Sequence, residues 1–202
     1  MARRSNREEI LNQAIQQFAA AGYAGVSMRD IARTCELNVG SLYHHFNDKQ
    51  QLYLAAVQQA FAGRAARLLA VLESPEPATE RLMRLIEVLC QLLGEDQTFS
   101  RLIQREVIDG DEERLKQLAE QVFGQLIAAL NRLCQQLNPR LDPALLACSV
   151  IGLVLHLFQY AALHRHLPGY HPEHEQPEII RQHIQQLLCQ GLISPPSSRG
   201  SA

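Results

Sequence analysis

Apolar residues recur with a helical period along almost the whole chain. Ile10, Ala14 and Phe18 fall four apart, which predicts a first helix, and Gly22 follows as a stop signal. Similar stripes predict further helices over residues 28–35, 39–46, 49–72, 80–93, 98–108, 112–137, 144–167 and 178–192. No alternating strand pattern and no internal repeat interrupts them. The pattern therefore predicts an all-α protein.

Breaks in this pattern suggest how the chain is divided. The Pro-rich stretch "ESPEPATE" at residues 73–80 interrupts the helices before the middle of the chain. We place a domain boundary there or within the preceding helix, which gives an N-terminal domain over residues 4–67 and a larger helical domain over residues 68–193. The polar, Pro-rich end, residues 194–202, is predicted to be disordered.

One predicted helix is apolar on every side. From Ala144 to Leu163 it is interrupted mainly by Ser149, His156 and Gln159. Its length would suit a membrane span, but a lone span with a central histidine is poor, so we expect a helix buried against its own chain and a second copy. The last helix adds another apolar stripe. Together they predict a two-fold dimer, with contacts at Leu155, Ile180, Ile184, Leu187 and Leu188.

Charge is distributed unevenly over the chain. The formal net charge is −2, yet residues 1–67 carry eight Arg and Lys against five Asp and Glu. A locally basic segment on an acidic body can still bind phosphates. The five cysteines are widely spaced without a CxxC pair, and the N-terminus shows no apolar signal-peptide run, so we expect reduced thiols in a cytoplasmic protein.

The stretch "NVGSLYHHF", residues 38–46, predicts a helix that faces something outside the core. It follows the short helix over residues 28–35 after a tight turn, which is the helix-turn-helix arrangement, and the second helix of such a pair enters the DNA major groove. Small residues at its start allow close approach, and hydroxyl and imidazole groups can hydrogen-bond bases or phosphates. The predicted DNA contacts are Ser27, Arg29, Gly40, Ser41, Tyr43, His44 and Lys49.

Some of these positions have plainer alternatives. Leu42 and Phe46 should pack on Ile31 and Phe18, so we expect Phe46 to be a core aromatic. Tyr43 is less readily a core residue. His44 and His45 can be solvated. The basic residues Arg3, Arg4 and Arg7 form either a solvated tail or a contact to phosphate or the minor groove.

Residues 8–54 resemble the DNA-binding segment of the TetR-type (TetR/AcrR) transcriptional repressors. The matching positions are Phe18, Gly22, Ser27, Ile31, Ala32, Gly40, Leu42, Tyr43, Phe46 and Lys49. The resemblance implies a three-helix DNA-binding domain, a larger helical ligand-binding and dimerisation domain, and the DNA contacts above, with Val39 added against a thymine methyl. Glu36 departs from the family, which usually has glycine in the turn, so it either adopts a left-handed conformation at a cost or the turn differs in shape.

The effector site is harder to place from sequence. Apolar stripes in the second half can wall a cavity, and polar residues on them are the informative ones, because buried polar groups need partners. Those partners are either a ligand or each other and the backbone. The candidate effector residues are Phe99, Ile103, Glu106, Phe123, Ile127, His156, Gln159 and Tyr160. They suggest a small, largely apolar effector.

Metal and enzyme chemistry find little support in the sequence. The loop "HRHLPGYHPEH" holds His164, His166, His171 and His174, yet no cysteine joins them and Pro and Gly make the loop mobile, so we expect no metal site. No HExxH, paired ExxH or GxSxG motif appears, so we expect neither enzyme activity nor a cofactor. A helical adaptor that uses the first domain on protein is the remaining alternative. The favoured hypothesis is a ligand-responsive repressor that binds palindromic duplex DNA as a homodimer.

Overall fold

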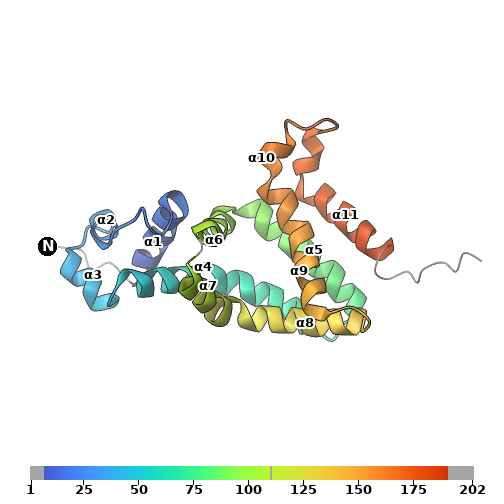
Figure 1. The fold of residues 1–202 in the computed structure, drawn as a ribbon, viewed down its shortest axis with the longest axis horizontal. Coiled ribbons are helices and arrows are strands. Elements are labelled where there is room, and N and C mark those ends of the chain that lie inside the picture. The colour runs from blue at the N-terminus through green and yellow to red at the C-terminus, as the bar shows by residue number, and fades with distance from the viewer. Residues whose placement is uncertain (1–6, 110, 191–202) are drawn as a thin grey trace, which may run out of the picture. The chain divides into compact units, whose positions relative to one another are not determined.

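A computed structural model describes residues 7–109 and 111–190, and these form helices and turns without a strand. The expected helices are present (Figure 1), with two that are divided more finely. The basic residues Arg3 and Arg4 and the predicted tail at 194–202 lie outside the described residues. The helices are α1 (Arg7–Ala21), α2 (Met28–Thr34), α3 (Val39–His45), α4 (Lys49–Leu72), α5 (Ala78–Glu95), α6 (Thr98–Asp109), α7 (Glu112–Leu118), α8 (Gly124–Leu137), α9 (Pro143–Gln159), α10 (Ala161–His164) and α11 (Pro177–Leu188).

Two helices expected to be continuous are interrupted. The stretch over 112–137 contains a π-helical segment, Ala119–Phe123, between α7 and α8. The stretch over 144–167 breaks at Tyr160, whose φ of −102° and ψ of 11° end α9 before α10 begins. After α10, a short 3₁₀ helix, Pro172–Glu175, precedes α11.

The chain folds into two compact units that do not follow the boundary expected at residues 67 and 68. The first unit contains residues 1–65 and 96–124, and the second contains residues 66–95 and 125–202. Helices α6 and α7 join the first unit because Leu102 and Leu118 are buried in the same core as α1 to α4. The assignment of DNA binding to residues 4–67 and of effector binding and dimerisation to residues 68–193 stays a prediction.

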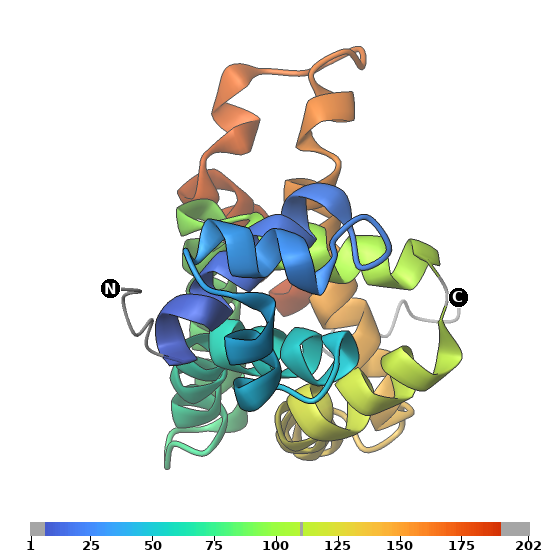
Figure 2. The ribbon, with the colours of Figure 1, turned by 90° about the vertical axis from the view of Figure 1, so that its left-hand side faces the viewer.

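The first unit is built on a core of aromatic and branched side chains. As expected, Leu42 and Phe46 of the α3 segment are buried in one cluster with Ile31 and Phe18. The Phe18 and Tyr53 rings meet edge to face, with centroids 5.0 Å apart. Helix α2 packs on both α1 and α3, as Figures 1 and 2 show, and α1 also packs on α6.

Caps and turns position the two short helices. Ser27 and Asn38 accept hydrogen bonds from the backbone N–H groups of Asp30 and Ser41, so these two residues are the N-caps of α2 and α3. Gly22 has a φ of 75° and ends α1, as its sequence signal indicated. Glu36 has a φ of 55°, which is the left-handed conformation that the turn requires and that glycine adopts without cost.

The second unit packs α5, α8, α9 and α11 around one apolar core. Leu82, Ile86 and Leu133 are fully buried there, together with Val150 and Val154 of α9. Helices α5 and α11 approach closely: a Cβ on Gly94 would lie 2.6 Å from Pro177 Cγ. No helix in the described part of the chain is long and apolar enough to cross a membrane.

Candidate functional site: the helix-turn-helix surface

The face of α3 that points away from the core carries the predicted DNA-contacting side chains. Tyr43 is 48% exposed, and Gly40 and His44 are also exposed, while Val39 and Ser41 are half-buried. The alternative that Tyr43 is a core aromatic is therefore wrong, whereas Phe46 is a core residue. Leu42, on the opposite face of α3, is buried in the core of the first unit. This packing determines which side chains of α3 face outward.

The Ser27 hydroxyl caps the N-terminus of α2. It donates to Asp30 Oδ2 at 2.5 Å and accepts from the Asp30 backbone N–H at 3.2 Å. The hydrogen bonds that the Ser27 hydroxyl and backbone N–H donate to the Asp30 carboxylate hold the pKa of Asp30 below its usual value, and Arg33 adds an ion pair of 2.7 Å. A phosphate contact through this hydroxyl would compete with the cap, whereas the nearby Arg29 side chain is exposed.

Lys49 is placed differently from the phosphate contact that the sequence suggested. Its ammonium donates to the carbonyl oxygens of Tyr23 and Val26, at 2.9 and 3.1 Å, and lies 4.1 Å from the centroid of the Tyr23 ring. Burial, with the Arg114 charge second, lowers the Lys49 pKa. Because these bonds hold the ammonium against the α1–α2 connection, its clearest role is to fix that connection on α4.

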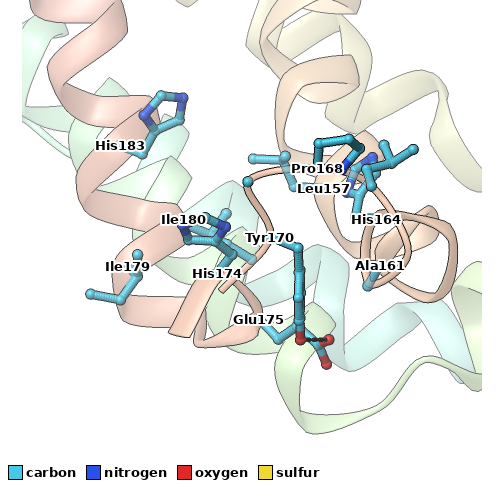
Figure 3. A pocket seen from close by; sticks show the side chains of 12 residues that line it. Leu157, Ala161, His164, Pro168, Tyr170, His174, Glu175, Ile179, Ile180 and His183 are labelled. Carbon is cyan, nitrogen blue, oxygen red and sulfur yellow. Dashed lines mark hydrogen bonds between the residues drawn. The ribbon is translucent and has the colours of Figure 1, made fainter. Parts of the chain in front are cut away.

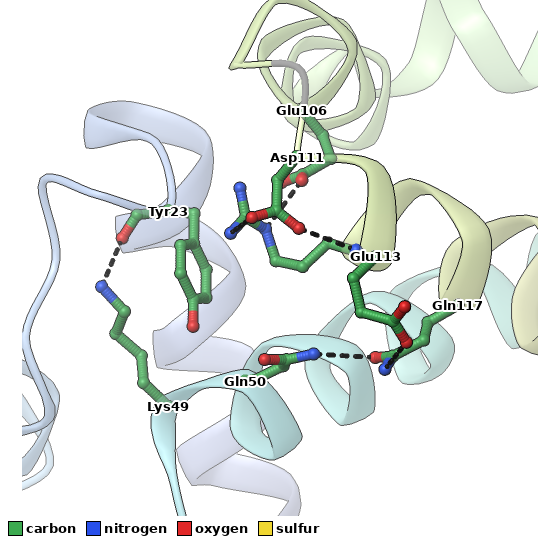
Figure 4. Close-up of polar contacts among 8 residues, drawn as sticks. Tyr23, Lys49, Gln50, Glu106, Asp111, Glu113 and Gln117 are labelled. Carbon is green, nitrogen blue, oxygen red and sulfur yellow. Dashed lines mark hydrogen bonds and ion pairs between the residues drawn. The ribbon is translucent and has the colours of Figure 1, made fainter.

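Glu106 has an internal partner that sequence reasoning missed. Its side chain is 1% exposed and accepts a hydrogen bond from Arg114 Nε at 2.8 Å. Arg114 also pairs with Asp111 at 3.1 Å and stacks over Tyr23, 4.0 Å from the ring centroid. Figure 4 shows these groups from α6 and α7 gathered beside Tyr23. A ligand would have to displace Arg114 to reach Glu106, so we do not retain Glu106 as an effector contact.

The network ties α6 and α7 to the helix-turn-helix helices of the first unit. Two cations lie close to the Tyr23 ring: the Lys49 ammonium from α4 and the Arg114 guanidinium from α7. Gln50 of α4 also donates to Gln117 of α7 at 3.0 Å (Figure 4). Burial raises the pKa of Tyr23, against the opposing Arg114 charge, so its hydroxyl stays protonated at neutral pH.

The other predicted effector residues fall into two groups. In the first unit, Phe99 and Phe123 pack around Phe61, with ring centroids 5.0 Å from it, and Ile103 is half-buried on the same core. In the second unit, Ile127 and Gln159 are half-buried, while His156 and Tyr160 are exposed with ring centroids 4.8 Å apart. The fold therefore distributes the predicted residues over both units.

Three of the five predicted dimer contacts are buried inside their own chain. Ile180, Ile184 and Leu188 are at most 6% exposed and belong to the core of the second unit, so they cannot also meet a partner. Leu187 is 47% exposed and Leu155 half-buried. One face of α9 is also exposed, including Leu145 at 70%, which is where the sequence predicted a second copy.

No group of three His, Cys, Asp or Glu side chains among residues 7–109 and 111–190 is arranged to hold a metal ion. The geometry instead defines a helix-turn-helix protein with a second, all-helical unit. Residues 10–56 match the family described as bacterial regulatory proteins, tetR family. This segment of the chain therefore resembles the DNA-binding segment of the TetR family.

Individual relatives agree with this assignment over different lengths. The HTH-type transcriptional repressor AcnR of Corynebacterium diphtheriae is 39% identical over 64 residues, which cover 32% of this chain and 33% of AcnR. The chain thus spans about a third of that curated relative's length in the match. The structure of FadR from Bacillus subtilis with stearoyl-CoA has a TM-score of 0.75 at 16% identity, covering 92% of this chain and 99% of FadR. AibR, solved with isovaleryl coenzyme A and operator DNA, gives 0.71 at 21% identity, covering 90% and 96%.

Proposed function

We propose that this protein is a ligand-responsive transcriptional regulator, a repressor, that binds a palindromic operator as a homodimer. The observation that carries the proposal is the α3 face: Tyr43, Gly40 and His44 are exposed on a helix whose other side is fixed by the core. In a helix-turn-helix, such a face lies in the major groove. The match of residues 10–56 to the TetR family supports it.

The proposed contacts divide into two kinds. Tyr43 meets a phosphate through its hydroxyl, which adds affinity without sequence preference, and His44 and Arg29 add to the same backbone contact. Ser41 and Val39, near the start of α3, meet base edges, with Val39 against a thymine methyl. Gly40 leaves room for the backbone to approach the DNA.

The test is operator binding measured by fluorescence anisotropy, with duplexes drawn from the DNA that flanks the coding gene. Tyr43→Phe should weaken binding to every duplex by roughly 3- to 10-fold, since one hydrogen bond is lost. Tyr160→Phe is the matched control, because both tyrosines are 48% exposed but only Tyr43 lies on α3. Ser41→Ala should instead change the preference among operator variants.

Two results would contradict these roles. If Tyr43→Phe binds operator and random DNA as well as wild type does, Tyr43 makes no phosphate contact. If affinity for duplex DNA does not fall steeply with salt, the first unit is an adaptor for protein and not a DNA-binding unit.

The proposed effector is small and largely apolar. AibR and FadR were solved with acyl-CoA thioesters, which are larger and carry phosphate charges, so isovaleryl-CoA and stearoyl-CoA represent the rival class of effector and are tested beside small apolar compounds by thermal shift. Movement of α6 by an effector would reach the DNA-binding helices, because Leu102 shares their core and Arg114 joins α6 and α7 to Tyr23. His156→Ala should alter the response to the effector while leaving operator affinity without effector within about tenfold.

A further inference from the structure

A half-open cavity lies in the second unit, and none of its lining residues is among the predicted effector residues. Its volume is about 320 Å³, at the lower end of the range for small-molecule sites. Leu157, Ala161, Ile179 and Ile180 supply an apolar lining from α9, α10 and α11. Figure 3 shows these side chains on opposite sides of the cavity, with the connection between α10 and α11 crossing between them.

The connection that closes the cavity is held in place by a polar cluster. Arg165 donates to both carboxylate oxygens of Glu175, at 2.6 and 2.7 Å, and the Tyr170 hydroxyl donates to Glu175 Oε1 at 2.5 Å. The bonds from Arg165 and Tyr170 lower the pKa of Glu175 to about 2. The only carboxylate in the lining is thus already engaged by a cation and a hydroxyl, which reduces its repulsion of an anion.

Imidazole groups supply the remaining polar lining. His164, His174 and His183 come from three different segments around the cavity (Figure 3). The backbone N–H of His171 donates to His174 Nδ1 at 3.3 Å, so the proton of the neutral His174 ring resides on Nε2 and is available to donate. The imidazoles of His164 and His183 make no hydrogen bond within residues 7–109 and 111–190, although the His164 ring lies 5.3 Å from the His156 ring, centroid to centroid. The cavity lining therefore combines imidazole N–H groups that can donate hydrogen bonds with apolar side chains.

Metal chelation does not fit these imidazoles, since no three potential ligands among the described residues converge on one point. A ligand complementary to the cavity has an acceptor group for the imidazole donors and a compact apolar body for the leucine and isoleucine side chains. A carboxylate is the stronger acceptor, because hydrogen bonds to an ionised group are roughly twice as strong as neutral ones.

We propose that this cavity binds a small organic carboxylate, with the carboxylate on His174 and His183, which lie on the same side of the cavity in Figure 3, and the apolar body against Leu157 and Ile180. This site is distinct from the predicted effector residues and does not depend on DNA binding. Its geometry suits a ligand of about the size of benzoate, given a cavity at the lower end of small-molecule sites.

The test uses benzoate as the probe and benzamide, which has the same shape without the charge, as the comparison. Isothermal titration calorimetry of the full chain should show benzoate binding at least about tenfold tighter than benzamide. His174→Leu and His183→Leu should each weaken benzoate binding by about tenfold, since each removes one charge-assisted hydrogen bond. His166→Leu is the matched control: His166 is exposed in the same connection but does not line the cavity.

Histidine imidazole NMR signals of the wild-type protein give a second measurement that needs no variant. Benzoate should shift the signals of His174 and His183 and leave that of His166 unchanged. The proposal is overturned if no imidazole signal responds to benzoate, or if benzamide and benzoate bind equally. It is also overturned if the same signals respond to protein concentration instead, because a second copy of the chain then fills the cavity.

Discussion

Removing the Glu106 carboxylate should destabilise the first unit strongly. Glu106 is 1% exposed and its partner Arg114 is 12% exposed, so Glu106→Ala leaves a nearly buried guanidinium without its closest anion. Breaking a buried pair costs about 3–5 kcal/mol. Asp111, 3.1 Å from Arg114, still offsets part of that charge, which places the expected loss near the low end, at about 3 kcal/mol. For a chain of this length the midpoint of thermal unfolding should fall by roughly 6–12 °C.

The assay is chemical unfolding followed by far-UV circular dichroism, since the chain has no tryptophan. The double variant Glu106→Leu/Arg114→Met should recover much of the loss, because an apolar pair leaves no buried charge. It should stay about 1 kcal/mol below wild type, since the Arg114 contact with the Tyr23 ring is lost as well. Glu112→Ala, at an exposed carboxylate on α7, is the control and should change stability by at most about 0.5 kcal/mol.

Two outcomes would refute this reasoning. One is a Glu106→Ala protein whose free energy of unfolding lies within about 0.5 kcal/mol of wild type, which would mean that the carboxylate is not paired and buried. The other is a double variant that is less stable than Glu106→Ala, which would mean that Arg114 stabilises the unit by itself.

Three further predictions concern a turn, a surface and a connection. Glu36→Gly should raise the free energy of unfolding by about 0.5–1 kcal/mol in the same assay, because glycine removes the strain of a φ of 55°; a loss would show that the Glu36 side chain matters more. If the protein forms the proposed homodimer, Leu187→Glu should convert it to a monomer and abolish operator binding without unfolding; light scattering measures this, and a monomeric wild type would contradict the proposed homodimer. The Glu175 pKa is depressed to about 2, so its stabilising pair with Arg165 is fully present above pH 4.5 and is lost as pH falls through about 2; a side-chain NMR titration with a midpoint near 4.5 would contradict this.

Local signals predicted the helix-turn-helix surface well because they act over a few residues. The caps at Ser27 and Asn38 and the stop at Gly22 depend on backbone groups within one turn of the chain. The left-handed Glu36 is one of the two alternatives left open at the turn position where the resembling family usually has glycine. Tyr43 faces outward because the buried residues of a seven-residue helix leave only one other side.

Longer-range features could not be predicted because periodicity identifies an apolar face and not its partner. Leu102 and Ile184 both lie on helical stripes, yet the first joins the core of α1 to α4 and the second the core of α5. For the same reason the stripe on α11 was interpreted as a dimer surface. The Arg114–Glu106 pair spans eight residues and the end of a helix, where no helical spacing indicates a contact.

The spacing between α5 and α11 depends on the absence of a side chain at Gly94. Alanine at this position would place its Cβ 2.6 Å from the rigid ring of Pro177, so α11 would have to shift at its first residue. Such a shift would carry along Ile179, which lines the cavity, and Leu187, which is exposed further along α11. Gly94→Ala would therefore displace α11 by a small amount. The variant would test whether the cavity and the exposed surface at Leu187 change together when α11 moves.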